Sequence, residues 1–219
     1  MITELTESQR AVLSAVCDTI VPRVERDPDP DGFWARTATD LGVDRGVEDL
    51  IAEMPDEQRE GLGELLDVLE SQGLRRAPSQ LSREQILTNV TLGSSQAATG
   101  VAALGALTLF LAYAAPDPET GQNPNWRTLG YPGPAGPPPE VPKPIQPLVP
   151  EGDTVTLEAD FCVVGSGSGG ATVAGVLAGR GLNVVVLEAA GYRNEADFAQ
   201  LELEAYQDMY WRGGPVGPG

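Results

Sequence analysis

Residues 161–170 read FCVVGSGSGG, and this stretch decides which fold the last third of the chain can form. Its first four residues predict a short apolar strand, and its glycines then predict a turn into a helix. A second apolar run, Asn183–Leu187, ends on Glu188, 18 residues after the last glycine of the stretch. The order predicts a strand–turn–helix–strand unit, with strands over 160–165 and 183–188 and a helix over 169–179.

The glycine spacing is that of a turn that binds a dinucleotide. Gly165 permits a tight turn, Gly167 lets the backbone approach a pyrophosphate, and Gly170 lets the helix pack closely on the strand. An acid at Glu188 suits a ribose diol and repels a 2′-phosphate. The predicted cofactor-binding residues are Gly165, Ser166, Gly167, Ser168, Gly169, Gly170 and Glu188. The motif alone does not separate FAD from NAD, and the alternative is a tightly packed turn that binds nothing.

The composition excludes several classes of function. The 219 residues carry a net charge of −18, which argues against a nucleic-acid partner because phosphate binding needs clustered Lys and Arg. There is no histidine, so a His-ligated metal, a Ser-His-Asp triad and a His base are excluded within this chain. We predict no metal site and no catalytic residue. Cys17 and Cys162 are expected to be buried, reduced thiols.

Residues 1–115 predict a small helical domain. Helices are expected after a capping box at 6–9 up to Pro22, from a cap at Asp31 to Gly42, after Asp44, from Pro55 to Gly73, and after a second capping box at 82–85. The last of these enters a stretch without charge, and Ala97–Ala115 is nearly all apolar. Because Ala and Gly supply most of this apolar character, we expect a buried helix and no membrane span.

Residues 116–153 are rich in Pro and Gly and predict neither a helix nor a central strand. A semi-rigid linker and a ligand for a Pro-binding module are two interpretations. The favoured one is a segment that crosses the surface of the domain that follows, anchored by Trp126, Leu129 and Tyr131. After the strand–helix–strand unit, we expect a capped turn over 194–198, a short helix through 201–209 and a loop over 213–219.

Several segments together resemble one enzyme family. Residues 163–170 and 181–189 look like the amino-terminal flavin segment of the glucose–methanol–choline (GMC) oxidoreductases. Residues 191–214 are similar to the long-chain alcohol oxidase-like branch of that family. Residues 5–22 and 123–134 are similar to the helical extension and the bridging segment of the same branch. A related helical module is the small subunit of gluconate 2-dehydrogenase-type complexes.

The resemblance implies an α + α/β fold. The N-terminal helical domain (1–115) is followed by a Pro/Gly-rich bridge (116–153) and by the first βαβ unit of an incomplete Rossmann-type FAD-binding domain (154–219). It also implies non-covalent FAD as cofactor and hydride transfer to it from an alcohol, a long-chain alcohol being one option.

The family's second flavin segment, substrate domain and His-containing catalytic pair have no counterpart in this sequence. We therefore expect the N-terminal part of an enzyme that is inactive alone, with FAD, an alcohol and a second polypeptide as partners. The alternative is a non-catalytic accessory or interaction subunit of a flavin dehydrogenase complex. A cytoplasmic location is expected, with association to a membrane left open.

Overall fold

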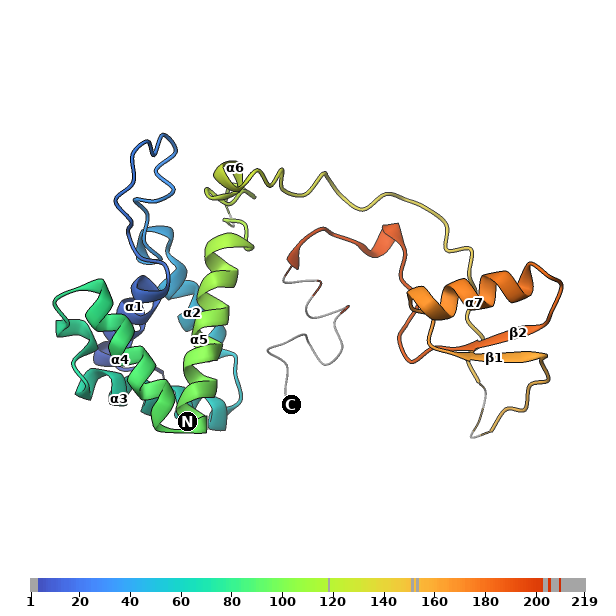
Figure 1. Ribbon diagram of the computed structural model, residues 1–219, viewed down its shortest axis with the longest axis horizontal. Helices are drawn as coiled ribbons and strands as arrows, with labels where there is room; N and C mark the ends of the chain where they lie inside the picture. Colours follow the sequence, from blue (N-terminus) through green and yellow to red (C-terminus); the bar gives the residue numbers. More distant parts are fainter. Residues whose placement is uncertain are drawn as a thin grey trace. The chain divides into compact units, whose positions relative to one another are not determined.

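A computed structural model describes residues 4–117, 119–150, 152, 154–202, 205 and 209 of the chain. The chain divides into a first unit of Met1–Gly136 with Ala199–Gly219, whose helical part lies in Met1–Gly136, and a second unit that spans Pro137–Phe198 (Figure 1). Among the described residues, the elements of the first unit are all helices, and the second unit has a two-stranded parallel sheet with one α-helix. At this coarse level the architecture agrees with the expected α + α/β class.

The helical unit contains six α-helices and two short 3₁₀ turns among its described residues. They are α1 (Glu7–Ile20), η1 (Thr39–Leu41), α2 (Val43–Ala52), α3 (Asp56–Ser71), η2 (Leu74–Arg76), α4 (Gln80–Gly93), α5 (Ser95–Tyr113) and α6 (Trp126–Leu129). The predicted capping box of α1 is confirmed, since the Gln9 amide donates to the Thr6 hydroxyl at 3.2 Å and the Thr6 amide donates to Oε1 of Gln9 at 2.9 Å. Short-range sequence rules therefore place the first helix correctly.

Two predicted helix starts are wrong, because a neighbouring side chain supplies the cap instead. No α-helix begins at Asp31; Asp29 accepts the Ala35 amide at 3.0 Å and holds this region in turns that end in η1. The helix assigned to the capping box at 82–85 begins earlier, since the Ser79 hydroxyl accepts the Ser82 amide at 3.2 Å. Ser82 therefore lies inside the first turn of α4.

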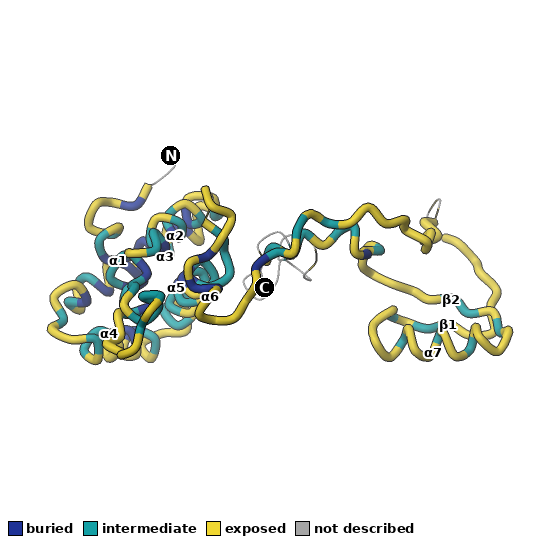
Figure 2. The backbone as a smooth tube through the Cα atoms, turned by 90° about the horizontal axis from the view of Figure 1, so that it is seen from above, coloured by how far each residue is buried: buried dark blue, intermediate teal, exposed yellow. Residues whose placement is uncertain are grey.

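The core of the helical unit is formed by side chains of α1 to α5, where Figure 2 shows most of the residues coloured as buried. Its fully buried large side chains include Leu13, Ile51, Leu66, Leu69, Leu74 and Leu104. The expectation that the apolar helix is buried holds for one face only, because Leu104, Thr108 and Ala112 are buried while Leu109 is 47% exposed. By length and composition, α5 is also the one helix among the described residues that could cross a membrane.

Three side chains close the C-terminal end of α5. Asn123 donates to the carbonyls of Ala112 at 3.1 Å and Ala115 at 2.7 Å, and Asn125 donates to Ala112 at 2.9 Å. The indole of Trp126 donates to the Tyr113 carbonyl at 2.9 Å. These side chains supply donors to carbonyls that have no partner within the helix. We call Asn123, Asn125 and Trp126 the α5 clamp.

The α5 clamp corrects the prediction for the Pro/Gly-rich segment. Trp126 is 3% exposed and its indole anchors on the helical unit that precedes the segment. Leu129 and Tyr131 are 53% and 46% exposed, so they do not serve as buried anchors. The prediction is therefore wrong for Trp126, but the later part of the segment does contact the unit that follows, since Asn194 donates to the Pro142 carbonyl at 3.1 Å and Lys143 pairs with Asp197 at 2.7 Å.

The second unit contains the predicted strand–helix–strand order. Strands β1 (Phe161–Val164) and β2 (Val184–Leu187) pair in parallel, with Phe161 opposite Val184 and Val164 opposite Leu187. Helix α7 (Ser168–Ala178) connects them, and the 3₁₀ turn η3 (Glu195–Asp197) follows. Asn194 forms a capping box at η3, which confirms the predicted capped turn. The predicted helix over 201–209 and loop over 213–219 fall largely outside the described residues.

The burial predicted for Cys162 is wrong. Cys162 is exposed, Val173 and Val176 are each 51% exposed, and Leu187 is 51% exposed. None of the residues of β1, α7 and β2, all of which are described, is buried. The reason is that α7 packs on two short strands only, which leaves the outer sides of all three elements uncovered.

Candidate functional site

The turn that joins β1 to α7 depends on Gly165. Its φ angle is 88°, a conformation that side chains with a Cβ atom rarely adopt. The Gly165 amide also donates to the Leu187 carbonyl at 2.7 Å, which extends the parallel pairing by one residue. The chain therefore leaves the sheet at a position that only glycine occupies without strain.

Gly170 sets how closely α7 approaches this turn. A Cβ atom at Gly170 would lie 1.9 Å from the Gly165 carbonyl oxygen and 3.2 Å from a methyl group of Val163. Any larger residue would therefore displace the helix from the strand. Beside Gly167, in contrast, a Cβ atom would meet no atom within 4 Å. The turn is closed on the side of the strand and open at Gly167.

The N-terminus of α7 carries no side-chain cap. Gly167 occupies the N-cap position, and no acidic residue lies in the first turn of the helix. The first amide groups of a helix have no carbonyl partner within it, and their aligned dipoles favour an anion at this end. Ser168 and Gly169 belong to this first turn. An uncapped helix start beside open space is suited to phosphate groups.

Glu188 lies against the same turn, although 22 residues separate it from Ser166. Its Oε2 accepts the Ser166 amide at 2.7 Å and the Ser166 hydroxyl at 2.6 Å. Its Oε1 accepts the amides of Ala189 at 2.8 Å and Ala190 at 3.0 Å. The Ser166 hydroxyl, followed by these amides, lowers the pKa of Glu188 to about 2, so the carboxylate stays charged above that pH.

The structure thus brings the predicted glycines and the predicted acid together at one end of β1 and β2. Sequence reasoning included Ser166 only because of its place in the glycine run. It missed the hydrogen bond from the Ser166 hydroxyl to Glu188, because no local pattern links two residues on different segments. The proximity follows from the parallel pairing of Val164 with Leu187, which ends both strands at the same edge.

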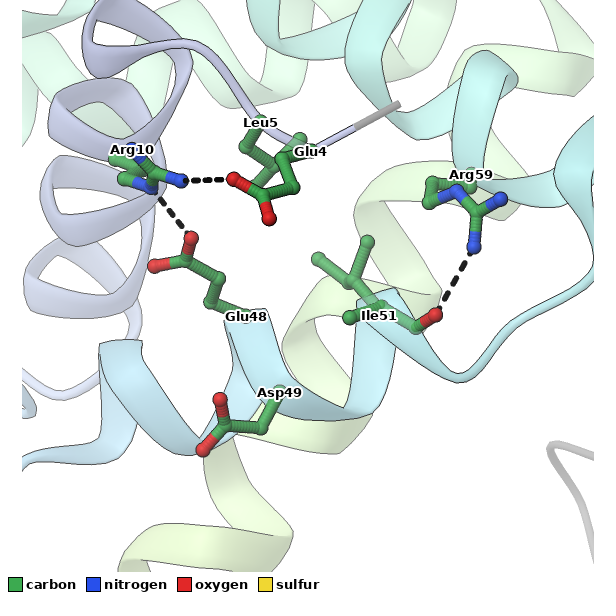
Figure 3. Close-up of a pocket in the computed structure, with 8 residues that line it drawn as sticks. Glu4, Leu5, Arg10, Glu48, Asp49, Ile51 and Arg59 are labelled. Atoms are coloured by element: carbon green, nitrogen blue, oxygen red, sulfur yellow. Dashed lines mark hydrogen bonds and ion pairs between the residues drawn. The ribbon is translucent and has the colours of Figure 1, made fainter. Parts of the chain in front are cut away.

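A hollow of about 220 Å³ lies elsewhere, between α1, α2 and the residues before α1 (Figure 3). Arg10 is paired there with Glu48 at 2.5 Å and with Glu4 at 3.6 Å, and Arg59 donates to the Ala52 carbonyl at 2.9 Å. Since its cations are already partnered, the hollow offers an anion no free charge. No group of three or more His, Cys, Asp or Glu side chains among the described residues could hold a metal ion.

Comparison with known proteins reveals short but clear similarities. Long-chain-alcohol oxidase FAO4A of Arabidopsis thaliana is 47% identical over 58 residues, which is 26% of this chain and 8% of that relative. Long-chain-alcohol oxidase FAO3 of the same plant is 42% identical over 64 residues, 29% of this chain and 9% of the relative.

A bacterial relative gives the same result. The uncharacterized GMC-type oxidoreductase y4nJ of Sinorhizobium fredii is 45% identical over 58 residues, 26% of this chain and 11% of the relative. This chain therefore spans only about a tenth of the length of the curated relatives it matches. No protein-family model matches the chain, and no solved structure matches it.

Proposed function

Because part of this chain belongs to the GMC-type oxidoreductases, we propose that it supplies the ADP-binding part of a flavin site in an alcohol oxidoreductase. The observation that carries the proposal is the position of Glu188, held at 2.7 Å from the Ser166 amide within the glycine turn. The turn offers an open helix start for a pyrophosphate, and Glu188 offers a charged acceptor for a ribose diol.

The proposed cofactor is FAD, with its ADP half at the β1–α7 turn. Gly165, Ser166, Gly167, Ser168, Gly169, Gly170 and Glu188 form the proposed site. The open space beside Gly167 fits a pyrophosphate, and the close approach at Gly170 keeps the helix start near it. When bound, FAD supplies an acceptor for the hydride that leaves the alcohol carbon. The βαβ unit is then the first part of a Rossmann-type domain, and residues 116–153 bridge it to a helical domain over 1–115.

The chain is proposed to be inactive by itself. Among its 219 residues there is no histidine, so a histidine base for the alcohol must come from sequence outside this chain. The relatives named as long-chain-alcohol oxidases favour an alcohol as the substrate of the complete enzyme. A long aliphatic alcohol is accordingly the substrate class to test first.

One observation favours a second function, that of a non-catalytic interaction subunit. Val164 is 83% exposed and Val176 is 51% exposed, so the βαβ unit presents apolar surface that another polypeptide could cover. In that case the unit would complete the sheet of a partner, and no nucleotide would be required at the turn.

Titration of the full chain with ADP and with FAD, followed by calorimetry, tests the first proposal. We expect binding by the wild type and loss of binding in Gly170→Ala, because the added Cβ atom collides with the Gly165 carbonyl. Gly105→Ala in α5 is the matched control, since a Cβ atom there meets nothing within 4 Å. Absence of ADP and FAD binding by the wild type would contradict the proposed function, and alcohol oxidation by the isolated chain would contradict its inactivity.

A further inference from the structure

The carboxylate of Glu188 has no free acceptor position in this structure. A carboxylate offers about four lone-pair sites, two on each oxygen. Oε2 accepts the amide and the hydroxyl of Ser166, and Oε1 accepts the amides of Ala189 and Ala190. A ribose hydroxyl can therefore donate to Glu188 only if one of these four donors leaves.

Three of the four donors are fixed by the backbone. Ala189 and Ala190 directly follow Glu188 in the chain, so their amides point to it as long as the chain turns at the end of β2. The Ser166 amide is held by the neighbouring turn residue Gly165, which donates to the Leu187 carbonyl at 2.7 Å. With the carboxylate in place, releasing any one of these amides requires the backbone to move.

The fourth donor is different. The Ser166 hydroxyl lies 2.6 Å from Oε2 of Glu188 and can leave by rotation about one side-chain bond. Ser166 is exposed, so the released hydroxyl can bond to water or to a ligand. Of the four hydrogen bonds to Glu188, this one is the least costly to exchange.

We propose that Ser166 moderates the preference of this turn for a ribose diol: its hydroxyl occupies Glu188 in the free chain and is exchanged for a ribose hydroxyl when a nucleotide with a free 2′,3′-diol binds. The inference rests on the proposed function, since it requires a nucleotide at the turn. A ligand without ribose hydroxyls has no donor to offer and leaves the Ser166–Glu188 bond in place. The exchange replaces one hydrogen bond to the carboxylate by another.

The full chain, titrated with ADP and with 2′,3′-dideoxy-ADP, tests the exchange. In Ser166→Ala, only water occupies the vacated acceptor site, so we expect ADP to bind about three- to tenfold more tightly than to the wild type. Binding of 2′,3′-dideoxy-ADP should change by less than about twofold, since this ligand does not use the site. Ser166→Thr keeps a hydroxyl and should resemble the wild type. Thr172→Ala is the matched control, because its hydroxyl donates only to the Ser168 carbonyl in its own helix.

Weaker ADP binding in Ser166→Ala, or an equal change for both ligands, would overturn the inference. A second measurement needs no ligand: the carboxyl carbon of Glu188 is titrated by NMR in the wild type and in Ser166→Ala. The wild type should titrate near 2 and the variant at higher pH, because the Ser166 hydroxyl is the largest cause of the low pKa. An unchanged titration overturns the inference even where ADP binds. A wild type that binds no ADP overturns the proposed function and the exchange together, whereas the titration judges the Ser166–Glu188 bond separately.

Discussion

The helical unit and the βαβ unit differ in how far their apolar side chains are exposed to solvent. In the helical unit, Leu13 and Leu66 are 1% and 0% exposed within a shared core. In the βαβ unit, the strand and helix residues Val164 and Val176 are 83% and 51% exposed. The apolar run of β2 is typical of a strand covered on both faces, so its sequence is suited to a larger assembly than the described residues form. The comparison indicates one self-sufficient unit and one that needs additional cover.

The largest expected difference between the two units is in the reactivity of their cysteines. Cys17 is fully buried in the helical core, and this burial raises the pKa of its thiol to about 11, while Cys162 is exposed on β1. At pH 8 we expect Cys162 to react with a thiol reagent at least about a thousandfold faster than Cys17, which reacts only after the core opens. Absorbance during labelling measures both phases, and Cys162→Ser should remove the fast one. A slow Cys162 would mean that the βαβ unit is covered in solution.

The second largest difference is expected in the free energy of unfolding when a large apolar side chain is truncated in each unit. Leu66→Ala removes a fully buried side chain and should lower the free energy of unfolding by about 2–5 kcal/mol. Val176→Ala removes a half-exposed side chain and should cost less than about 0.5 kcal/mol. Urea unfolding followed by circular dichroism measures the pair. Similar losses in the two variants would show that α7 packs on something further.

The α5 clamp gives a smaller effect, confined to the helical unit. Asn123→Ala removes the donor to the Ala115 carbonyl and one of two donors to Ala112, so we expect a loss of about 1–3 kcal/mol. The same urea titration applies, with the exposed neighbour variant Gln122→Ala as control. Equal stability of both variants would mean that water replaces the Asn123 side chain without cost.

The smallest effect concerns the charge of Glu188. Its folded pKa of about 2 lies below the ordinary value of 4.5, so the stabilisation it contributes is present above pH 4.5 and is lost as the pH falls through about 2. The protection factor of the Ser166 amide, which compares its exchange rate with the intrinsic rate at the same pH, should therefore fall at acid pH in the wild type. Glu188→Gln carries no such charge and should show no change tied to this range. A wild type without the acid transition would refute the hydrogen bonds at Glu188.

Local sequence patterns predict the positions of helices and turns better than they predict which side chains are buried. The capping box of Thr6 and Gln9 and the turn at Gly165 were predicted because the partners lie within a few residues. The start of α4 was misplaced because Ser79 and Ser82 are both good caps, and only geometry decides between them. The exposure of Cys162 was missed because an apolar strand does not reveal how many neighbours cover it.

The candidate site shows the same limit. Its glycines and its acid follow from spacing along the chain. The hydrogen bond from the Ser166 hydroxyl to Glu188 depends on how two strands pair, and so it required the structure. The clamp residue Asn123 is a further case, because its carbonyl partner Ala112 lies 11 residues away. Contacts between segments are set by packing, which a single sequence specifies only indirectly.

The α5 clamp also fixes where this chain can be cut or recombined. A protease that cleaved between Ala115 and Asn123 would detach the clamp and release the end of α5, whose carbonyls would then need water. A cut beyond Gly136 would leave the clamp and the helical core intact. Gene fusions that exchange the βαβ unit should therefore join past Gly136. A junction directly after α5 would remove the α5 clamp from the helical unit.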